Sequence, residues 1–157
     1  MFLSTALLFS LFACSRDTEY NDSVPCSEIL DTLEEQLPID LGYETYGGDY
    51  VEYHFGNLGE CDDRSIRYSV LSENIDEFGI FHAKDKKSKD LISNSVENYI
   101  QSMVKDKKEF IASYAPKELP KLESAEVSVY GNYVAYAILS DKDRSTFFET
   151  VENLLNK

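Results

Sequence analysis

The chain has 157 residues, of which 43 % are hydrophobic and 28 % are charged. This length and balance fit a single globular domain, and they exclude both a disordered chain and one built of membrane spans throughout. The formal net charge of −14 repels phosphate groups. We therefore expect no nucleic-acid partner and no docking of the domain itself onto anionic lipid head groups.

The first segment of the chain, residues 1–13, is uncharged and apolar or small, and it ends at Cys14. About a dozen apolar residues are too few to cross a bilayer, which takes ~20, but they suit the apolar region of a secretory signal. Residues 11–14, LFAC, resemble a bacterial lipobox. The resemblance implies a lipoprotein signal peptide at 1–13 and acylation of Cys14, with palmitate-type chains as a membrane anchor. The alternative is a buried N-terminal helix or strand with an ordinary cysteine.

Residues 14–25 are polar and are predicted to form a flexible tether that ends at Pro25. A helix is predicted to follow, with Ser27 as its N-cap and Pro38 at its end. Its apolar side chains fall on one face: Ile29, Leu30, Leu33 and Leu37. We therefore place a single folded domain at 26–157.

Residues 38–63 are interrupted by five glycines, and periodicity does not decide their structure. Val51, Tyr53 and Phe55 alternate with polar residues as in a strand. The same stretch also fits a short helix that ends at Gly56. Both interpretations stay open.

Cys26 and Cys61 form an even pair if Cys14 is acylated. Outside the cytoplasm, the two are candidates for a disulfide. Closing this loop of ~35 residues would stabilise the fold by roughly 3–4 kcal/mol in the chain-entropy model. The alternative is two independent thiols, and the spacing lacks the C-x-x-C motif of redox proteins.

A strand is predicted over 64–70, where apolar and polar residues alternate, and another over 75–82. In the second strand, Phe78 and Ile80 share one face, whereas Glu77 lies on the other face.

A run of lysines, KDKKSKD, leads into the longest predicted helix, 86–114, which has an apolar stripe along its length. The Gly-Asn pair at 131–132 lies between two β-rich runs in residues 126–139 and predicts a tight hairpin. A last helix is predicted to begin at a capping Asp141 or Asp143.

The order is therefore helix, undecided segment, strand, strand, long helix, hairpin, helix. It predicts an α+β fold. We expect a two-layer sandwich of a mostly antiparallel sheet, with a long central helix and a C-terminal helix on one face.

Three stretches carry a further resemblance: DEFGIF at 76–81, FIASYAPKELPKLESA at 110–125 and VYGNYV at 129–134. They resemble a recurring domain of lipoproteins from low-GC Gram-positive anaerobes, the domain-of-unknown-function family four-three-five-eight. The resemblance covers roughly residues 26–156, and a lipobox cysteine ahead of the domain is similar to that family's usual layout. It implies no known activity, cofactor or catalytic residue.

Residues that could carry chemistry are few. Of the two histidines, His82 is expected to be a partly exposed histidine at a strand end, and His54 a packing residue in a Tyr/Phe-rich stretch. One cluster holds the ligand types that zinc prefers: His54, Glu60, Cys61, Asp62 and Asp63. Its spacing matches no standard zinc motif, and the acidic loops lack the ligand offsets of an EF-hand. We therefore expect no catalytic residue, no metal site and no cofactor.

The 11 tyrosines suggest a different kind of site. A tyrosine pairs an apolar ring with a polar tip, so clustered tyrosines can stack on sugars or on partner side chains. The candidates are Tyr43, Tyr46, Tyr50, Tyr53, Tyr68, Tyr130, Tyr133 and Tyr136. The alternative is that these are ordinary sheet and loop tyrosines.

The sequence therefore predicts a lipid-anchored extracytoplasmic protein at the cell membrane, acting as a non-enzymatic binding or accessory module of the envelope. Its expected partners are the membrane, through the acyl anchor on Cys14, and a protein or envelope component. One alternative is a small envelope hydrolase, or a redox or metal-binding protein, that uses His54 and Cys61. Another is a purely structural spacer.

Overall fold

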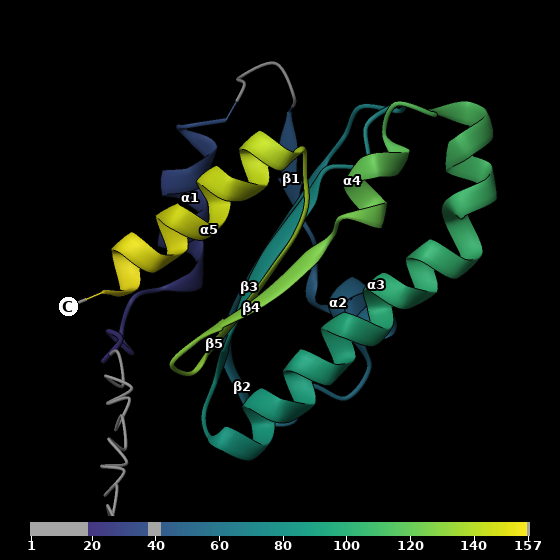
Figure 1. Ribbon diagram of the computed structural model, residues 1–157. Coiled ribbons are helices and arrows are strands. Elements are labelled where there is room, and N and C mark those ends of the chain that lie inside the picture. Colours follow the sequence, from purple (N-terminus) through teal and green to yellow (C-terminus); the bar gives the residue numbers. More distant parts are fainter. Residues whose placement is uncertain (1–18, 38–41, 157) are drawn as a thin grey trace, which may run out of the picture.

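The structure is a computed structural model that describes residues 19–37 and 42–156. Its helices and strands follow one another along the chain (Figure 1). In order they are α1 (Cys26–Glu34), β1 (Tyr43–Thr45), α2 (Gly48–Phe55), β2 (Cys61–Ser69), β3 (Glu77–Ala83), α3 (Lys86–Tyr114), α4 (Leu119–Glu123), β4 (Glu126–Tyr130), β5 (Tyr133–Ile138) and α5 (Asp141–Leu155). None of these described helices is long and apolar enough to cross a membrane.

The strands form one five-stranded antiparallel sheet in the order β1-β2-β3-β5-β4. The predicted α+β class, the antiparallel sheet, the long helix and the C-terminal helix are confirmed. The long helix α3 has the predicted bounds, and the side chain of its N-cap, Asp85, accepts a hydrogen bond of 2.7 Å from the Ser88 N–H. The hairpin turns at Gly131, whose φ of 59° is one that glycine adopts readily.

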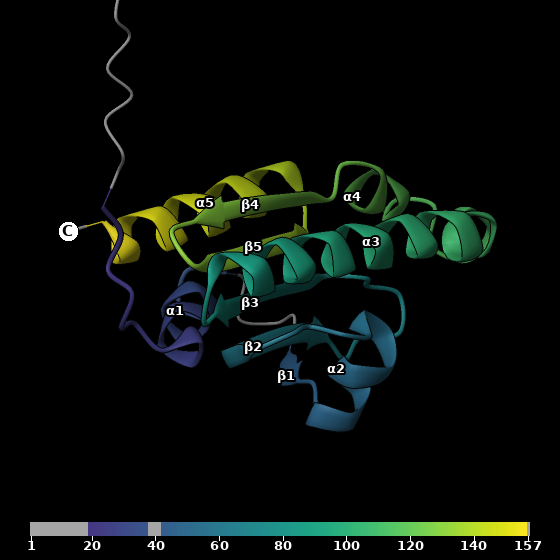
Figure 2. The same cartoon turned by 90° about the horizontal axis from the view of Figure 1, so that it is seen from below.

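The placement of the helices differs from the prediction, because the fold has three layers rather than two. Helices α1 and α5 cover one face of the sheet, and α2 and α3 cover the other (Figure 1, Figure 2). The reason lies in β5, where every residue is buried. Ala135 and Ala137 pack under α1 and α5, whereas Val134 and Tyr136 pack under α2 and α3. A strand that is apolar on both faces needs a helical layer on each side.

Three local expectations are decided by the structure. The undecided stretch is the helix α2, which ends at Gly56 with a φ of 67°. The cap of α5 is Ser140, whose hydroxyl accepts a hydrogen bond from the Asp143 N–H, rather than Asp141 or Asp143. Helix α1 begins at Cys26 with Pro25 before it, so Ser27 is not its cap.

The last part of the predicted tether belongs to the folded domain. Tyr20 forms a β-bridge with Asn156 and packs its ring edge-on against Tyr130, with centroids 5.7 Å apart. The buried Tyr133 donates its hydroxyl to the Val24 carbonyl at 2.8 Å. The prediction of a flexible tether over 14–25 is therefore wrong for residues 20–25. The signal segment at 1–13, Cys14 and residues 15–18 lie outside the described residues.

Candidate functional site

The site is built around a buried carboxylate. Glu77, the first residue of β3, is only 4 % exposed. Three tyrosine hydroxyls donate hydrogen bonds to it. Tyr136 reaches Oε1 at 2.7 Å, and Tyr99 and Tyr46 reach Oε2 at 3.0 and 3.1 Å. We call these four residues the Glu77 cluster. It joins β3, β5, α3 and the segment between β1 and α2.

Burial and hydrogen bonding act on Glu77 in opposite directions. Desolvation raises the pKa of the carboxyl above its ordinary 4.5, and the three hydroxyls partly offset that shift. A buried carboxylate is costly unless its oxygens are hydrogen-bonded, and here both oxygens accept at least one bond. Burial also raises the pKa of Tyr136 and Tyr99, so these groups remain donors. The cluster therefore fixes the orientations of its tyrosine rings.

Tyr46 extends from this cluster into a stack of aromatic rings at the surface. Its ring stacks on Tyr68 of β2 at 4.1 Å between centroids, and on Tyr50 of α2 at 3.9 Å. Tyr50 in turn contacts His54, one helical turn further along α2, at 4.0 Å. Pairs at this spacing lie on the same helix face, which is why α2 can continue the stack.

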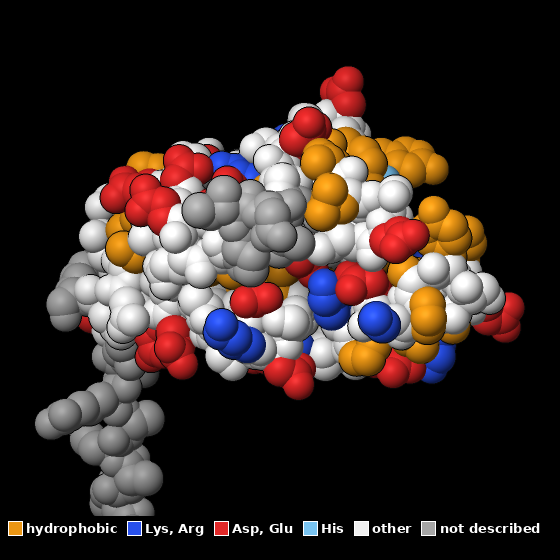
Figure 3. Space-filling view, turned by 90° about the horizontal axis from the view of Figure 1, so that it is seen from above, with side chains coloured by type: hydrophobic (Ala, Val, Ile, Leu, Met, Phe, Trp, Pro, Cys, Tyr) orange, Lys and Arg blue, Asp and Glu red, His pale blue; other side chains and the backbone are white. Residues whose placement is uncertain are grey.

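A cleft continues this aromatic surface between α2 and α3. It has a volume of about 210 Å³. Its lining residues are Tyr53, His54, Tyr99, Ser102, Met103, Asp106 and Lys107. Figure 3 shows hydrophobic side chains gathered at the end of the molecule that carries α2 and the C-terminal half of α3. We call Tyr46, Tyr50, Tyr53, His54, Tyr68 and Tyr99 the aromatic face.

The groups of the aromatic face differ in how they meet solvent. Tyr53 is 84 % exposed, and its ring stands at 85° to the ring of His54. Burial and the nearby Lys107 ammonium lower the pKa of His54 below its ordinary 6.5, so its imidazole is neutral at pH 7. A neutral imidazole offers one donor and one acceptor. The face thus combines flat apolar rings with uncharged polar groups.

The structure divides the eight candidate tyrosines. Tyr46, Tyr50, Tyr53 and Tyr68 come together on the aromatic face. The others do not: Tyr136 is interior, Tyr43 donates to Asp76 under the α5 layer, and Tyr130 and Tyr133 lie at the hairpin.

Sequence reasoning missed Glu77 and Tyr99 as parts of this site. The only signs of these two residues in the sequence were that Glu77 is a carboxylate on an otherwise apolar strand face and that Tyr99 is a tyrosine within the apolar stripe of α3.

The two described cysteines are free thiols on opposite faces of the sheet. Cys26 is fully buried in the core under α1 and α5, whereas Cys61 packs against the core under α2 and α3. Asp63 hydrogen-bonds to both: its carboxylate accepts the Cys26 N–H at 2.7 Å, and its carbonyl accepts the Cys61 thiol. Burial first, and then Asp63, raise the pKa of the Cys26 thiol; burial also raises that of Cys61. The candidate disulfide stays a prediction.

The histidines and acidic loops do not converge. In the described parts of the chain, no group of three or more His, Cys, Asp or Glu side chains is arranged to hold a metal ion. His54 belongs to the aromatic face, whereas Cys61 makes its hydrogen bond to the Asp63 carbonyl at 3.3 Å. His82 pairs with Asp22 at 3.0 Å. The residues that the hydrolase or metal alternative would use are thus in separate environments.

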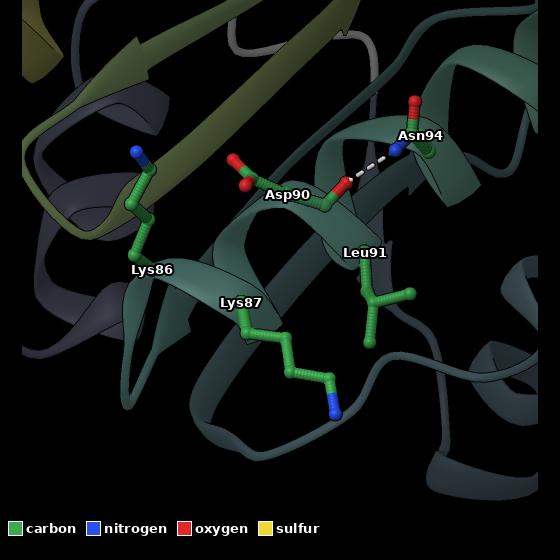
Figure 4. A pocket seen from close by; sticks show the side chains of 5 residues that line it. All are labelled: Lys86, Lys87, Asp90, Leu91 and Asn94. Carbon is green, nitrogen blue, oxygen red and sulfur yellow. Dashed lines mark hydrogen bonds between the residues drawn. The ribbon is translucent and has the colours of Figure 1, made fainter.

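A wider basin lies at the start of α3, with a volume of about 440 Å³. Lys86 and Lys87 border it but point away from each other (Figure 4). The Asn94 amide is already bonded to the Asp90 carbonyl at 2.8 Å. The basic run at this helix start therefore presents no convergent set of groups, and the aromatic face remains the better-built candidate.

These features define the class of protein: a three-layer α+β domain with an aromatic face held from behind by a buried carboxylate. The chain belongs to the family DUF4358, a domain of unknown function, whose model matches residues 58–139, more than half of the chain. The match includes Glu77, Tyr99 and Tyr136, and it begins after the end of α2. A search of curated proteins and a search of solved structures each found no match.

Proposed function

We propose that this protein is a lipid-anchored, extracytoplasmic binding module that has no catalytic activity of its own. Support for the anchor comes from the sequence LFAC at residues 11–14. The folded domain follows it closely, because the first residues that the structure describes already pack on the surface of the domain. Support for binding comes from the aromatic face. Acylation of Cys14 would hold the module on the outer side of the cell membrane, where it meets a protein or envelope component.

The observation that carries the binding role is the support of the aromatic face from behind. Tyr46 and Tyr99 each place a ring on the face while donating a hydroxyl to Glu77. Rings that are fixed before binding lose little conformational entropy when a ligand arrives, so preorganisation raises affinity. Tyrosine is also the residue type that binding surfaces favour, because it adds large area with few rotatable bonds.

Anchoring and binding are tested separately. Cells that express the chain are fed an alkyne fatty acid, and the label on the wild type is compared with that on Cys14→Ala. We expect the wild type alone to be labelled and to sediment with membranes. Equal labelling of both proteins, or a wild-type chain whose mass still includes residues 1–13, would refute the anchor.

For binding, membranes are crosslinked and the chain is purified from wild type, Tyr53→Ala and Phe110→Ala cells. Phe110 is the matched control, because it is an aromatic residue of α3 that is 65 % exposed and does not line the cleft. We expect a crosslinked species that Tyr53→Ala loses and Phe110→Ala keeps. A species that both variants keep, or no species from the wild type, contradicts binding through the aromatic face.

A further inference from the structure

The cleft between α2 and α3 has a chemistry that selects its ligand. Its rings come from Tyr53, His54 and Tyr99, and the strongly exposed Tyr53 ring gives the cleft an open apolar wall. Aromatic rings are attracted to flat faces of C–H groups and to cations alike. The polar groups of the cleft must therefore decide which of these two kinds of ligand it accepts.

Those polar groups favour an uncharged ligand. The cleft is lined by one carboxylate, Asp106, and one ammonium, Lys107, and His54 is neutral. Because these two opposite charges offset each other, the cleft has no local net charge that would compensate a cation or an anion for its lost hydration. A neutral ligand rich in hydroxyls can accept from Lys107 and donate to Asp106 without losing the hydration of a charge of its own.

The size of the cleft limits how much of a ligand it can hold. Its 210 Å³ lie below the roughly 300–1,000 Å³ typical of sites for drug-sized molecules. Such a space suits one ring of a longer chain rather than a whole ligand. Ser102 adds a hydroxyl oxygen that still can accept, because its hydrogen is donated to the Tyr99 carbonyl at 2.8 Å.

We infer that this cleft binds a pyranose unit of a neutral, β-linked glycan, with the sugar ring stacked on Tyr53 and its hydroxyls on Asp106, Lys107, Ser102 and His54. A β-linked, gluco-configured pyranose has its hydroxyls and its linkage oxygen at the rim and only C–H groups on its flat faces, so it matches an aromatic wall beside polar groups. This inference rests on the proposed function, since it names the ligand class of the same aromatic face.

The two histidines make a built-in test, because they are the only two in the chain and occupy different surfaces. His54 lines the cleft, whereas His82 pairs with Asp22 beside Tyr133. The full chain is placed in lipid nanodiscs, and the imidazole NMR signals are followed during titration with cellotetraose and with fully N-acetylated chitotetraose. Sorbitol is the control probe, because it carries similar hydroxyls but has no ring.

We expect at least one tetrasaccharide to shift the His54 signal saturably while His82 stays in place, and sorbitol to shift neither. Tyr53→Ala should weaken binding by about tenfold, the upper value for one aromatic contact. Tyr53→Phe keeps the ring and should bind like the wild type, as should Phe110→Ala. An unchanged His82 signal shows that each variant is folded.

Three results would overturn the inference: no His54 shift with either sugar, an equal shift with sorbitol, or undiminished binding by Tyr53→Ala. The crosslinking experiment separates this failure from a failure of the proposed function. If the sugars fail while a crosslinked partner still depends on Tyr53, the module binds a protein instead. If both fail, the aromatic face is not a binding site.

Discussion

At the scale of single residues, Glu77 ties the interior to the aromatic face through three hydrogen bonds. Replacement by alanine leaves the hydroxyls of Tyr99 and Tyr136 buried without an acceptor. Each unsatisfied buried group costs about 1–3 kcal/mol, so we expect Glu77→Ala to lower the free energy of unfolding by roughly 3–5 kcal/mol. Urea denaturation monitored by circular dichroism measures this loss. A change within experimental error would show that water replaces the carboxylate at no cost.

The pH dependence of stability isolates the charge of Glu77 from its hydrogen bonds. Because burial raises the pKa of this carboxyl above 4.5, the folded chain holds its proton more tightly than the unfolded chain. The stability that Glu77 contributes is therefore fully present below pH 4.5 and falls as the pH rises through the raised pKa. Glu77→Gln carries no titrating group and should lack this fall. Parallel pH profiles of the wild type and Glu77→Gln would contradict the raised pKa.

At the scale of elements, Gly79 sets how closely β3 meets its two neighbouring strands. A Cβ at this position would lie 2.6 Å from Cε1 of Tyr136 and 2.8 Å from Cγ1 of Ile66. Tyr136 would have to move, and its hydroxyl would leave Glu77. We expect Gly79→Ala to destabilise the fold by about 1–3 kcal/mol, as overpacking does in other cores. Thermal unfolding and the near-ultraviolet tyrosine spectrum measure both consequences.

At Gly48, the same change of glycine to alanine is expected not to destabilise the fold, in contrast to Gly79→Ala. It begins α2, and a Cβ added there would have Nη2 of Arg64 as its nearest neighbour, at an ordinary 3.6 Å. Alanine favours the helix and restricts the unfolded chain, so Gly48→Ala should be neutral or stabilise by up to about 1 kcal/mol. Equal losses from both substitutions would show that the close strand packing at Gly79 is not the cause.

Helices and strands with a clear hydrophobic periodicity could be predicted from the sequence, whereas the packing of these elements against one another could not. Alternation and the apolar stripe located β3 and α3, and β3 carries Phe78 and Phe81 on opposite faces as expected. Residues 48–55 fit both the alternation of a strand and the spacing of a helix. The helix is favoured only because it packs Val51 and Phe55 onto the sheet. Periodicity shows that α5 has an apolar face, but it does not show which of the two faces of the sheet this helix covers.

The candidate site shows the same limit more sharply. Tyr46, Tyr99 and Tyr136 lie 31, 22 and 59 residues from Glu77 along the chain, in elements of different type. No local pattern joins them, since only the folded sheet and its α3 layer bring the four side chains together. The sequence could indicate that tyrosines form a surface, but their division between interior, hairpin and aromatic face required the fold.

At the scale of the whole molecule, the segment of residues 19–25 before α1 joins the end of α5 to the hairpin. The Asn21 N–H bonds the Leu155 carbonyl at 2.6 Å, and the Asn132 amide donates to the Asp22 carboxylate at 2.9 Å. Cys14 precedes Glu19 by five residues, which span at most roughly 18 Å when fully extended. Under the proposed anchoring, the hairpin end of the domain is therefore held close to the membrane surface.

This arrangement predicts that residues 19–25 stabilise the domain rather than only lead to it. A chain that starts at Cys26 loses the Tyr20–Tyr130 ring contact and leaves the hydroxyl of the buried Tyr133 without the Val24 carbonyl. Compared with a chain that starts at Glu19, we expect a loss of about 2–4 kcal/mol in the free energy of unfolding. Hydrogen exchange should also quicken first at the amides of β4 and β5 that flank the turn. If both chains unfold at the same urea concentration, the segment is a passive leader and the distance limit on the anchored domain no longer holds.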